Sequence, residues 1–528
     1  MSRPLAFQFA IFPSVIVAVL AAVAMHAQGP GRGAPPPPEI RPKNLVANAT
    51  PVRTCESLTS VSLPNTTMDA ANIDATDGSC RITATVTHPP SGDQVKVFIG
   101  IPMKDWNGRF EGTGGGGFSG GNANGVRQPL SIGYAAGATD TGHTGASGSF
   151  ALDSTGHLNW QLIRDNAYLG IHEMTTTGKA LTQALYNTPP RESYFMGCST
   201  GGRQSLSEVQ RYPEDYNGVV AGAPATNWTK LHMEQMWGNL TMLLAGNFVP
   251  QCKFEAATNA AIAACDKLDG VQDGVIGDPL RCNFDPKVLV GTTAGNCGVI
   301  TEADAAVIRA IWEGPKRSDG SFLWYGLTRG ASFAGLSGTG GTPVAGMPNA
   351  ITLEWWRFFL NQNPQWDWHT LTREAYENYW TQSVEEFSAV LATDNPNLAP
   401  FRDRGGKVIL WHGLADQLIY PQGTIDYYQR VQQQLGGTEK TSAFARLYLA
   451  PGVAHCGGGA GPQPGGQLDA LVHWVEDGKA PETLEAATRD QAGKVVRTRP
   501  LCQYPLVAKY KGTGSTDEAS NFTCSAEF

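Results

Sequence analysis

The chain has 528 residues, of which 41% are hydrophobic and 16% are charged. This balance is typical of a globular protein, and the length predicts two domains or one domain with a large insertion. The formal net charge of -8, with no basic block, argues against nucleic acid or an anionic membrane surface as a partner.

The N-terminus has the pattern of a secretory signal peptide over residues 1–27. Arg3 precedes an apolar run from about Leu5 to Val23, and small residues crowd the end of that run. An uncleaved membrane anchor is the alternative, because the run is close to the length that spans a bilayer. Residues 28–51 are rich in Gly and Pro and predict an extended tether. We expect a secreted or periplasmic protein that makes no membrane contact after signal cleavage.

In the chain after the tether, predicted strands and helices alternate in two parts, one over residues 95–221 and one over residues 407–435. The sequence predicts strands over 95–101, 134–139, 193–196 and 219–221, and helices over 164–186 and 201–212. After a long interruption, a strand over 407–411 and a helix over 425–435 follow. This alternation predicts an α/β doubly wound sheet of the α/β-hydrolase kind.

Between these two parts of the chain, over residues 226–404, the sequence predicts no regular series of strands. The length of this stretch suits a lid domain inserted between two strands of the core. The predicted core then consists of a first part, 52–225, and a second part, 405–528.

Ten cysteines, an even number, follow the signal segment. In an exported chain an even count favours disulfides over free thiols or a zinc site. Proximity along the chain suggests three pairs, which are Cys55–Cys80, Cys265–Cys282 and Cys502–Cys524. That leaves Cys198–Cys456, and Cys252–Cys297 by elimination, although sequence alone does not fix the connectivity.

The segment Gly-Cys-Ser-Thr-Gly at 197–201 contains the GxSxG pattern, with Ser199 at its centre. A lone GxSxG often arises by chance, because Gly and Ser are common. Here an apolar strand precedes the pattern and a helix follows it, which is the context in which the motif forms a sharp turn and exposes the serine hydroxyl. Ser199 is therefore the candidate nucleophile.

Asp416 and His455 complete a candidate triad in the chain order Ser, Asp, His, which is the order in α/β-hydrolases. Asp416 follows a core strand, where its carboxylate can orient an imidazole; a turn aspartate is the alternative. His455 lies in a loop and is the candidate general base. The other histidines that could act as the base are chiefly His143, His172, His232 and His412.

Two backbone N–H groups are needed for an oxyanion hole, and the amide of Thr200, directly after the nucleophile, is the first candidate. The glycine run 114–117 resembles the loop that supplies the second donor in such enzymes, and we favour Gly115 or Gly116. A flexible surface loop is the alternative explanation of this run.

An acidic loop over 266–275 is a candidate metal site in the predicted lid. Three carboxylates lie around glycine turns, and backbone carbonyls can complete the oxygen shell that Ca²⁺ prefers. A solvated acidic turn is the alternative. The position in the lid favours a structural role for the metal. The candidate ligands are Asp266, Asp269, Val271, Asp273 and Val275.

Together these motifs resemble the tannase/feruloyl esterase family. The resemblance rests on Gly-Cys-Ser-Thr-Gly-Gly-Arg at 197–203, on the segment around Asp416 and on His455-Cys456, and it extends over essentially the whole chain after the tether. It implies a secreted serine esterase that acts on esters of aromatic acids. It also implies a disulfide between Cys198 and Cys456 and a calcium site at 266–275.

The lid is expected to determine which ester is bound. Its aromatic residues could stack on a phenolic or terephthalic ring, although packing within the lid explains each of them at least as well. Arg329 and Arg357 could pair with a substrate carboxylate. The aromatic residues concerned are Trp355, Trp356, Phe358, Phe359, Trp366 and Trp368.

The expected function is hydrolysis of feruloyl-type or galloyl-type esters through an acyl-enzyme on Ser199, with a small aromatic ester as the partner molecule. One alternative keeps this mechanism and takes a terephthalate monoester as substrate. Another applies the same triad to peptides, because fold and triad do not define the bond that is cleaved. The last alternative is a catalytically silent binding protein braced by calcium.

Overall fold

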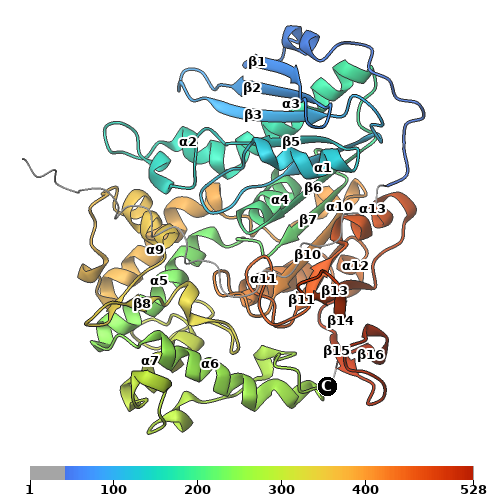
Figure 1. Ribbon diagram of the computed structural model, residues 1–528. Coiled ribbons are helices and arrows are strands. Elements are labelled where there is room, and N and C mark those ends of the chain that lie inside the picture. The colour runs from blue at the N-terminus through green and yellow to red at the C-terminus, as the bar shows by residue number, and fades with distance from the viewer. Residues whose placement is uncertain (1–41, 527–528) are drawn as a thin grey trace, which may run out of the picture.

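The computed structural model describes residues 42–526, so the predicted signal peptide and the first part of the tether, up to residue 41, lie outside the described residues. A nine-stranded sheet forms the centre of the structure (Figure 1). In their spatial order, the strands are β1 (Thr66–Ile73), β2 (Cys80–Val86), β3 (Val95–Ile101), β5 (Ala135–Thr139), β4 (Arg109–Thr113), β6 (Glu192–Cys198), β7 (Gly218–Gly222), β10 (Lys407–Gly413) and β11 (Ala445–Ala450).

The sheet is mixed. The first four strands in space, β1, β2, β3 and β5, pair antiparallel, and all pairs from β5 to β11 are parallel. In the parallel part, Cys198 at the end of β6 pairs with Gly222 of β7, which in turn pairs with Trp411 of β10. The loops that follow β6 and β10 therefore leave the same edge of the sheet, and these are the loops that carry Ser199 and Asp416.

Helices cover both faces of the sheet because its strands alternate between two apolar cores. On one face, Phe195 and Val219 belong to the core that also contains Leu206. On the other face, their neighbours Tyr194 and Val220 belong to a different core. The helices nearest the sheet are α3 (Gly170–Tyr186), α4 (Thr200–Arg211) and α11 (Pro421–Gln434), which contribute to the first core, and α13 (Gln467–Asp477), which contributes to the second.

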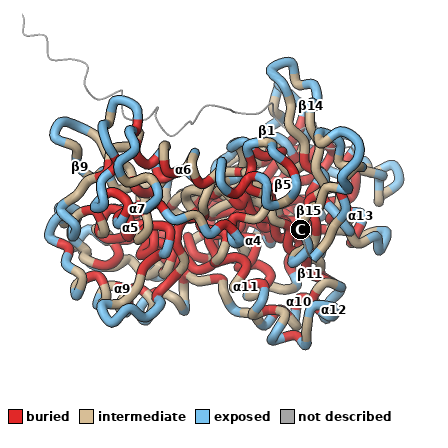
Figure 2. Tube along the Cα trace, turned by 90° about the horizontal axis from the view of Figure 1, so that it is seen from below, coloured by how far each residue is buried: buried red, intermediate tan, exposed pale blue. Residues whose placement is uncertain are grey.

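Between β7 and β10 the chain forms a largely helical region that lies beside the sheet (Figure 1). Its aromatic residues share a core with Phe118 and Phe150, which precede β6 in the chain, and buried segments run through both this region and the sheet (Figure 2). The limits of the lid, 226–404, stay a prediction. The elements here are α5 (Trp228–Ala245), α6 (Gln251–Cys265), α7 (Glu302–Glu313), α8 (Ala350–Glu354), α9 (Arg373–Leu391) and the two-residue strands β8 (Thr339–Gly340) and β9 (Ala345–Gly346).

The C-terminal segment adds two small antiparallel sheets that the sequence analysis did not predict. They consist of β12 (Gln463–Gly465), β13 (Thr483–Arg489), β14 (Val495–Cys502), β15 (Val507–Tyr510) and β16 (Phe522–Ser525). The remaining short helices are α1 (Arg127–Ser131), α2 (Trp160–Arg164), α10 (Ala399–Asp403), which directly precedes β10, and α12 (Thr438–Ser442). Among residues 42–526, no helix is both long enough and apolar enough to span a membrane.

The helix predicted over 164–186 is interrupted, and this prediction was wrong in detail. α2 ends at Arg164, a π-helical turn spans Asp165–Leu169, and α3 begins at Gly170. The turn has a structural use, because the guanidinium of Arg203 on α4 donates to the carbonyl groups of Asn166 and Ala167. The turn is thereby tied to the helix that follows Ser199.

All ten cysteines form disulfides, in the five pairs that proximity and elimination suggested. The Cys198–Cys456 bridge spans 258 residues of sequence and joins the end of β6 to the loop that carries His455. The other four bridges close segments of 17 to 45 residues.

Candidate active site

Ser199 lies on a sharp turn between β6 and α4. Its backbone has φ 64° and ψ -123°, a conformation that a residue with a side chain rarely adopts. The turn is tight enough that a Cβ on Gly197 would lie 2.5 Å from the carbonyl carbon of Gly201. The N–H of Ser199 donates to the carbonyl of Gly222 at 2.9 Å, which anchors the turn to β7. The glycine of the motif is therefore required by the close approach of backbone to backbone.

A continuous chain of hydrogen bonds links the three residues of the predicted triad. Ser199 Oγ lies 2.9 Å from His455 Nε2, and His455 Nδ1 lies 2.8 Å from Asp416 Oδ2. The second carboxylate oxygen of Asp416 accepts the backbone N–H groups of Leu418 and Ile419, at 2.8 and 2.9 Å. Asp416 is fully buried, so its orientation is fixed by these contacts.

The electrostatics of Asp416 and His455 suit a general base at His455. Burial alone would raise the pKa of Asp416, but the charge of His455 and the hydrogen bonds from His412 and His455 lower it below its ordinary value. Burial disfavours the charged form of His455, yet the Asp416 carboxylate outweighs this effect and raises the pKa of the imidazole. Asp416 therefore remains a carboxylate and holds the proton of His455 on Nδ1, leaving Nε2 free to accept from Ser199.

His412, one of the alternative bases, is placed beside the triad instead. Its Nε2 lies 3.2 Å from Asp416 Oδ2 and 2.9 Å from the carbonyl oxygen of Ile419, and its Nδ1 lies 2.8 Å from Thr424 Oγ1. It is fully buried, and its contact with Asp416 Oδ2 helps to orient the carboxylate. Its position four residues before Asp416 was visible in the sequence, but the contact depends on the turn after β10.

Two further contacts hold the loop of His455 in place. The Cys198–Cys456 disulfide joins the neighbour of the serine to the neighbour of the histidine, with their Cα atoms 5.9 Å apart. The backbone N–H of His455 donates to the side-chain oxygen of Gln417 at 3.1 Å. The sequence analysis did not identify Gln417, since nothing but its position beside Asp416 distinguishes it.

The glycine run lies against the nucleophile turn, as an oxyanion loop requires. The carbonyl of Gly115 accepts the N–H of Gly201 at 3.1 Å. However, the N–H of Gly115 is already donated to Gln204 Oε1 at 2.9 Å, which leaves it unsuited to receive an oxyanion. Thr200 begins α4, and its N–H has no hydrogen-bond partner among residues 42–526, so this donor remains for the site; Gly116 forms an isolated β-bridge with Ser119.

The predicted calcium ligands lie on one compact loop. Asp266 accepts the N–H groups of Asp273 and Gly274, both at 3.1 Å, and Asp269 accepts that of Val271 at 3.0 Å. Burial, together with the charges of Asp273 and Asp266, raises the pKa of Asp269 to about 6. Val275 is buried, and its N–H donates to Asp273. The donor set is entirely oxygen, which a hard cation such as Ca²⁺ prefers, but Asp273 Oδ2 already accepts from Arg499 at 2.7 Å and from Arg497 at 3.4 Å.

The aromatic residues of the lid pack mainly against one another. Trp355, Trp356, Phe359 and Trp368 are buried in the lid core, with Phe358 and Trp366 packed against it. The two lid arginines also have partners. Arg357 donates to the carbonyl of Trp366 at 3.3 Å, and Arg329 donates to that of Phe284 at 3.1 Å.

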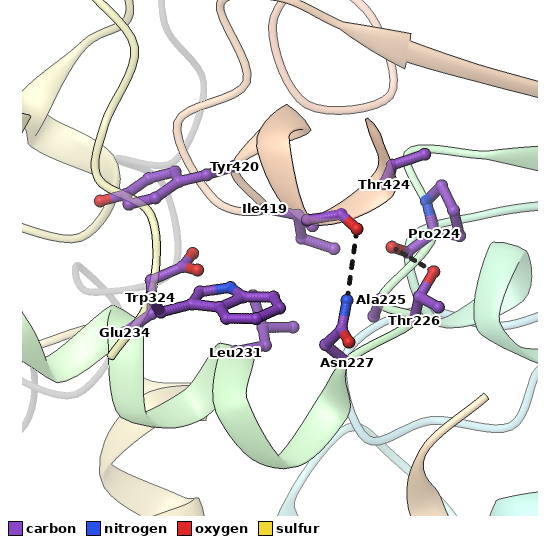
Figure 3. Close-up of a pocket in the computed structure, with 11 residues that line it drawn as sticks. Pro224, Ala225, Thr226, Asn227, Leu231, Glu234, Trp324, Ile419, Tyr420 and Thr424 are labelled. Atoms are coloured by element: carbon purple, nitrogen blue, oxygen red, sulfur yellow. Dashed lines mark hydrogen bonds between the residues drawn. The ribbon is translucent and has the colours of Figure 1, made fainter. Parts of the chain in front are cut away.

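Residues of the predicted lid and of the core line a pocket (Figure 3). Ala225 and Ile419 line it, and their N–H groups donate to the carbonyl of Ser199 and to the carboxylate of Asp416. From the lid, Trp324 and Glu234 line the same pocket. Glu234 is buried, with one oxygen unpartnered within the described chain, and burial followed by the charge of Asp416 raises its pKa well above the ordinary value. Sequence reasoning missed this residue.

A hydroxyl bonded to an imidazole that a buried carboxylate orients, on the edge of this mixed sheet, is the arrangement of serine hydrolases of the α/β-hydrolase fold. The comparisons with known proteins specify the class further. A family model described as "Tannase and feruloyl esterase" matches residues 80–525. A "Probable feruloyl esterase" of Arthroderma benhamiae is 41% identical over 484 residues, which cover 89% of this chain and 88% of that protein.

Two further proteins show the same likeness. A mono(2-hydroxyethyl) terephthalate hydrolase of Piscinibacter sakaiensis is 31% identical and is matched over 82% of each chain. The crystal structure of feruloyl esterase B from Aspergillus oryzae superposes with a TM-score of 0.78 at 29% identity, covering 89% of this chain and 99% of that one. The chain belongs to the tannase and feruloyl esterase family, and it is a carboxylic ester hydrolase.

Proposed function

We propose that this enzyme is exported and hydrolyses esters of aromatic carboxylic acids, of feruloyl or galloyl type, through an acyl-enzyme on Ser199. The observation that carries the proposal is the unbroken hydrogen-bond chain from Ser199 Oγ through His455 to Asp416. The relatives named as feruloyl esterases support the choice of acyl group.

In the proposed reaction, His455 Nε2 takes the hydroxyl proton while Ser199 Oγ attacks the ester carbonyl carbon. The negative charge that develops on the carbonyl oxygen is received by the N–H groups of Thr200 and Gly116. The imidazolium then protonates the departing alcohol, and the acyl group stays on the serine. A water molecule, deprotonated by the same imidazole, hydrolyses the acyl-enzyme and restores Ser199.

For the lid we propose a structural Ca²⁺ held by Asp266, Asp269 and Asp273 with the carbonyl groups of Val271 and Val275. A bound cation would add to the positive charge of Arg497 and Arg499, which already pair with Asp273, and would balance the remaining carboxylates of the loop. The Cys265–Cys282 disulfide closes the segment that contains this loop. The carboxylates would order the loop by binding the cation. No step of ester hydrolysis depends on these carboxylates.

Export is supported by the five disulfides, which persist in oxidising compartments. N-terminal sequencing of protein recovered from the medium or the periplasm tests it. The proposal expects the mature chain to begin near residue 28, and an intact N-terminus on membrane-associated protein would contradict it.

A second candidate is hydrolysis of a terephthalate monoester by the same mechanism, favoured by the relative that is named for that activity. One experiment separates the two. The wild type, Ser199→Ala and the control Ser442→Ala are assayed on methyl ferulate, methyl gallate, mono(2-hydroxyethyl) terephthalate and a short alkyl ester. Ser442 is a matched control because it lies on α12, where its hydroxyl donates to the carbonyl of Glu439 within the same helix.

The proposal expects the highest kcat/KM on the ferulate or gallate ester, with activity lost in Ser199→Ala and kept in the control. A highest value on the terephthalate monoester would establish the second candidate. Oxidised, calcium-loaded wild type that hydrolyses none of the four esters would contradict both candidates.

A further inference from the structure

A second polar centre lies in the core domain, away from the triad. His88, in the loop between β2 and β3, has Nδ1 2.6 Å from Asp93 Oδ2 and Nε2 2.5 Å from Glu173 Oε1. Asp165, at the start of the π-helical turn, has its Oδ1 3.5 Å from His88 Nδ1. One ligand atom from each of His88, Asp93 and Asp165 lies within 4.8 Å of the others. Three separate segments thus bring one imidazole and three carboxylates together.

Asp165 is the unusual member of this cluster. Its side chain is 0% exposed, and one oxygen accepts from Gln161 Nε2 at 2.8 Å. The other oxygen, Oδ2, is buried without a hydrogen-bond partner among the described residues. An unpartnered buried carboxylate oxygen is costly, so such a group normally has a ligand or a proton. Burial, with added repulsion from Asp93 and Glu173, raises the pKa of Asp165 to about 7.

The cluster carries excess negative charge unless a carboxylate takes up a proton or a cation is bound. The charged groups that act most strongly on Asp165 are Asp93, His88 and Glu173. Even if His88 is protonated, three carboxylates face one imidazolium, and negative charge remains in excess. A divalent cation would remove most of this excess, with Asp165 Oδ1 as the oxygen nearest to His88.

We propose that His88 Nδ1, Asp93 and Asp165 bind a divalent transition cation, with Zn²⁺ as the best match. One nitrogen and two carboxylate ligands suit Zn²⁺, whereas Ca²⁺ takes oxygen ligands such as those of the lid loop. Glu173 accepts the Nε2–H of His88, which is the carboxylate–histidine–metal relay that fixes the tautomer of a ligating imidazole. Asp93 is also positioned, because its Oδ1 accepts the backbone N–H of His88 at 3.0 Å.

The place of the site in the fold defines its effect. The cation would join the loop between β2 and β3 to the π-helical turn, whose carbonyl groups hold Arg203 on α4. It would therefore stabilise the support of the nucleophile helix. The side chain of His88 is 21% exposed, which gives the ion a route from solvent.

The test uses the full oxidised enzyme, stripped with EDTA and returned to excess Ca²⁺, so that the lid loop is filled. Zn²⁺ alone is then added, and bound zinc is measured by plasma mass spectrometry after desalting and by calorimetry. Binding to Asp165→Asn and His88→Gln is compared with that to His473→Gln, an exposed histidine paired with Asp477 at 2.8 Å. Esterase activity and circular dichroism verify that each variant is folded.

The expected result is one zinc per wild-type chain, affinity at least tenfold weaker in Asp165→Asn and His88→Gln, and no change in His473→Gln. Cobalt in place of zinc should give a visible absorption band that is lost in His88→Gln, which decides the question if Asp165→Asn does not fold. No stoichiometric zinc in the wild type would overturn the proposal. Zinc that is lost in Glu208→Gln but kept in Asp165→Asn would also overturn it, by placing the metal in the other cluster, His172, Glu208 and Asp215.

Discussion

The Cys198–Cys456 disulfide is expected to serve catalysis as well as stability, and replacing both cysteines by serine separates the two roles. The bridge joins the residue before Ser199 to the residue after His455. The hydrogen bond between Ser199 Oγ and His455 Nε2 is 2.9 Å long. Without the bridge, the histidine loop keeps its contacts with Gln417 and Asp416 and the backbone hydrogen bond from Ala415 to Val453. Serine is a suitable replacement because Cys456 is exposed and Cys198 is only partly buried.

The expected loss of stability follows from the length of chain that each bridge closes. In the entropic model, a bridge across 258 residues stabilises the native state by about 5.5 kcal/mol. The Cys502–Cys524 bridge, across 22 residues, gives about 3.4 kcal/mol and lies in the C-terminal sheets. Its double serine variant is the matched control, since it loses a disulfide without touching the triad.

The assay measures kcat on methyl ferulate at a temperature where circular dichroism shows both double variants to be folded. Small misplacements of reacting groups reduce rates strongly, so we expect kcat to fall roughly 10- to 100-fold in the Cys198/Cys456 variant. The Cys502/Cys524 variant should keep its kcat within about twofold while its Tm falls. A folded Cys198/Cys456 variant with normal kcat would refute the reasoning.

Four further predictions follow from the same contacts. Asp416→Asn should lower kcat by about 10⁴-fold, because the wrong tautomer of the imidazole is then favoured; a steady-state assay of folded protein measures this. Since Asp416 raises the pKa of His455, kcat/KM should fall as pH drops through that raised value, and a pH profile of the wild type checks it. Calcium affinity should weaken below about pH 6, where Asp269 takes up a proton, and calorimetry at several pH values measures this. Glu234→Gln should leave Tm and kcat nearly unchanged, because burial raises the pKa of Glu234 and favours the neutral form that an amide resembles; a large loss of either would show that its charge is needed.

The parts of the fold that could be predicted are those with strong local patterns. β10 is buried along almost its whole length and appears in the sequence as an unbroken apolar run. β1, by contrast, has largely part-buried or exposed residues, and its sequence Thr-Thr-Met-Asp-Ala-Ala-Asn-Ile shows no alternation of apolar and polar residues. Edge strands of this kind are held by pairing with a neighbour, which a single sequence does not reveal.

The candidate site likewise contains residues that local sequence identifies and residues whose role depends on contacts between distant parts of the chain. Ser199 is identified by its neighbours in the chain, because the turn that exposes it is built within five residues. Gln204 removes Gly115 from the pair of oxyanion candidates through a contact across 89 positions, and no local pattern predicts that contact. Glu234 and Asp165 are ordinary helix residues in the sequence, and their unpartnered oxygens follow from packing alone.

The most direct test of the account is covalent labelling of the enzyme with a fluorophosphonate, with methyl ferulate present or absent. The account predicts one label per chain, on the peptide that contains Ser199, with complete loss of esterase activity and protection by the ester. Asp416→Asn should label far more slowly, since His455 would no longer activate the hydroxyl. Loss of activity with the label on another residue, or full activity with Ser199 labelled, would contradict it.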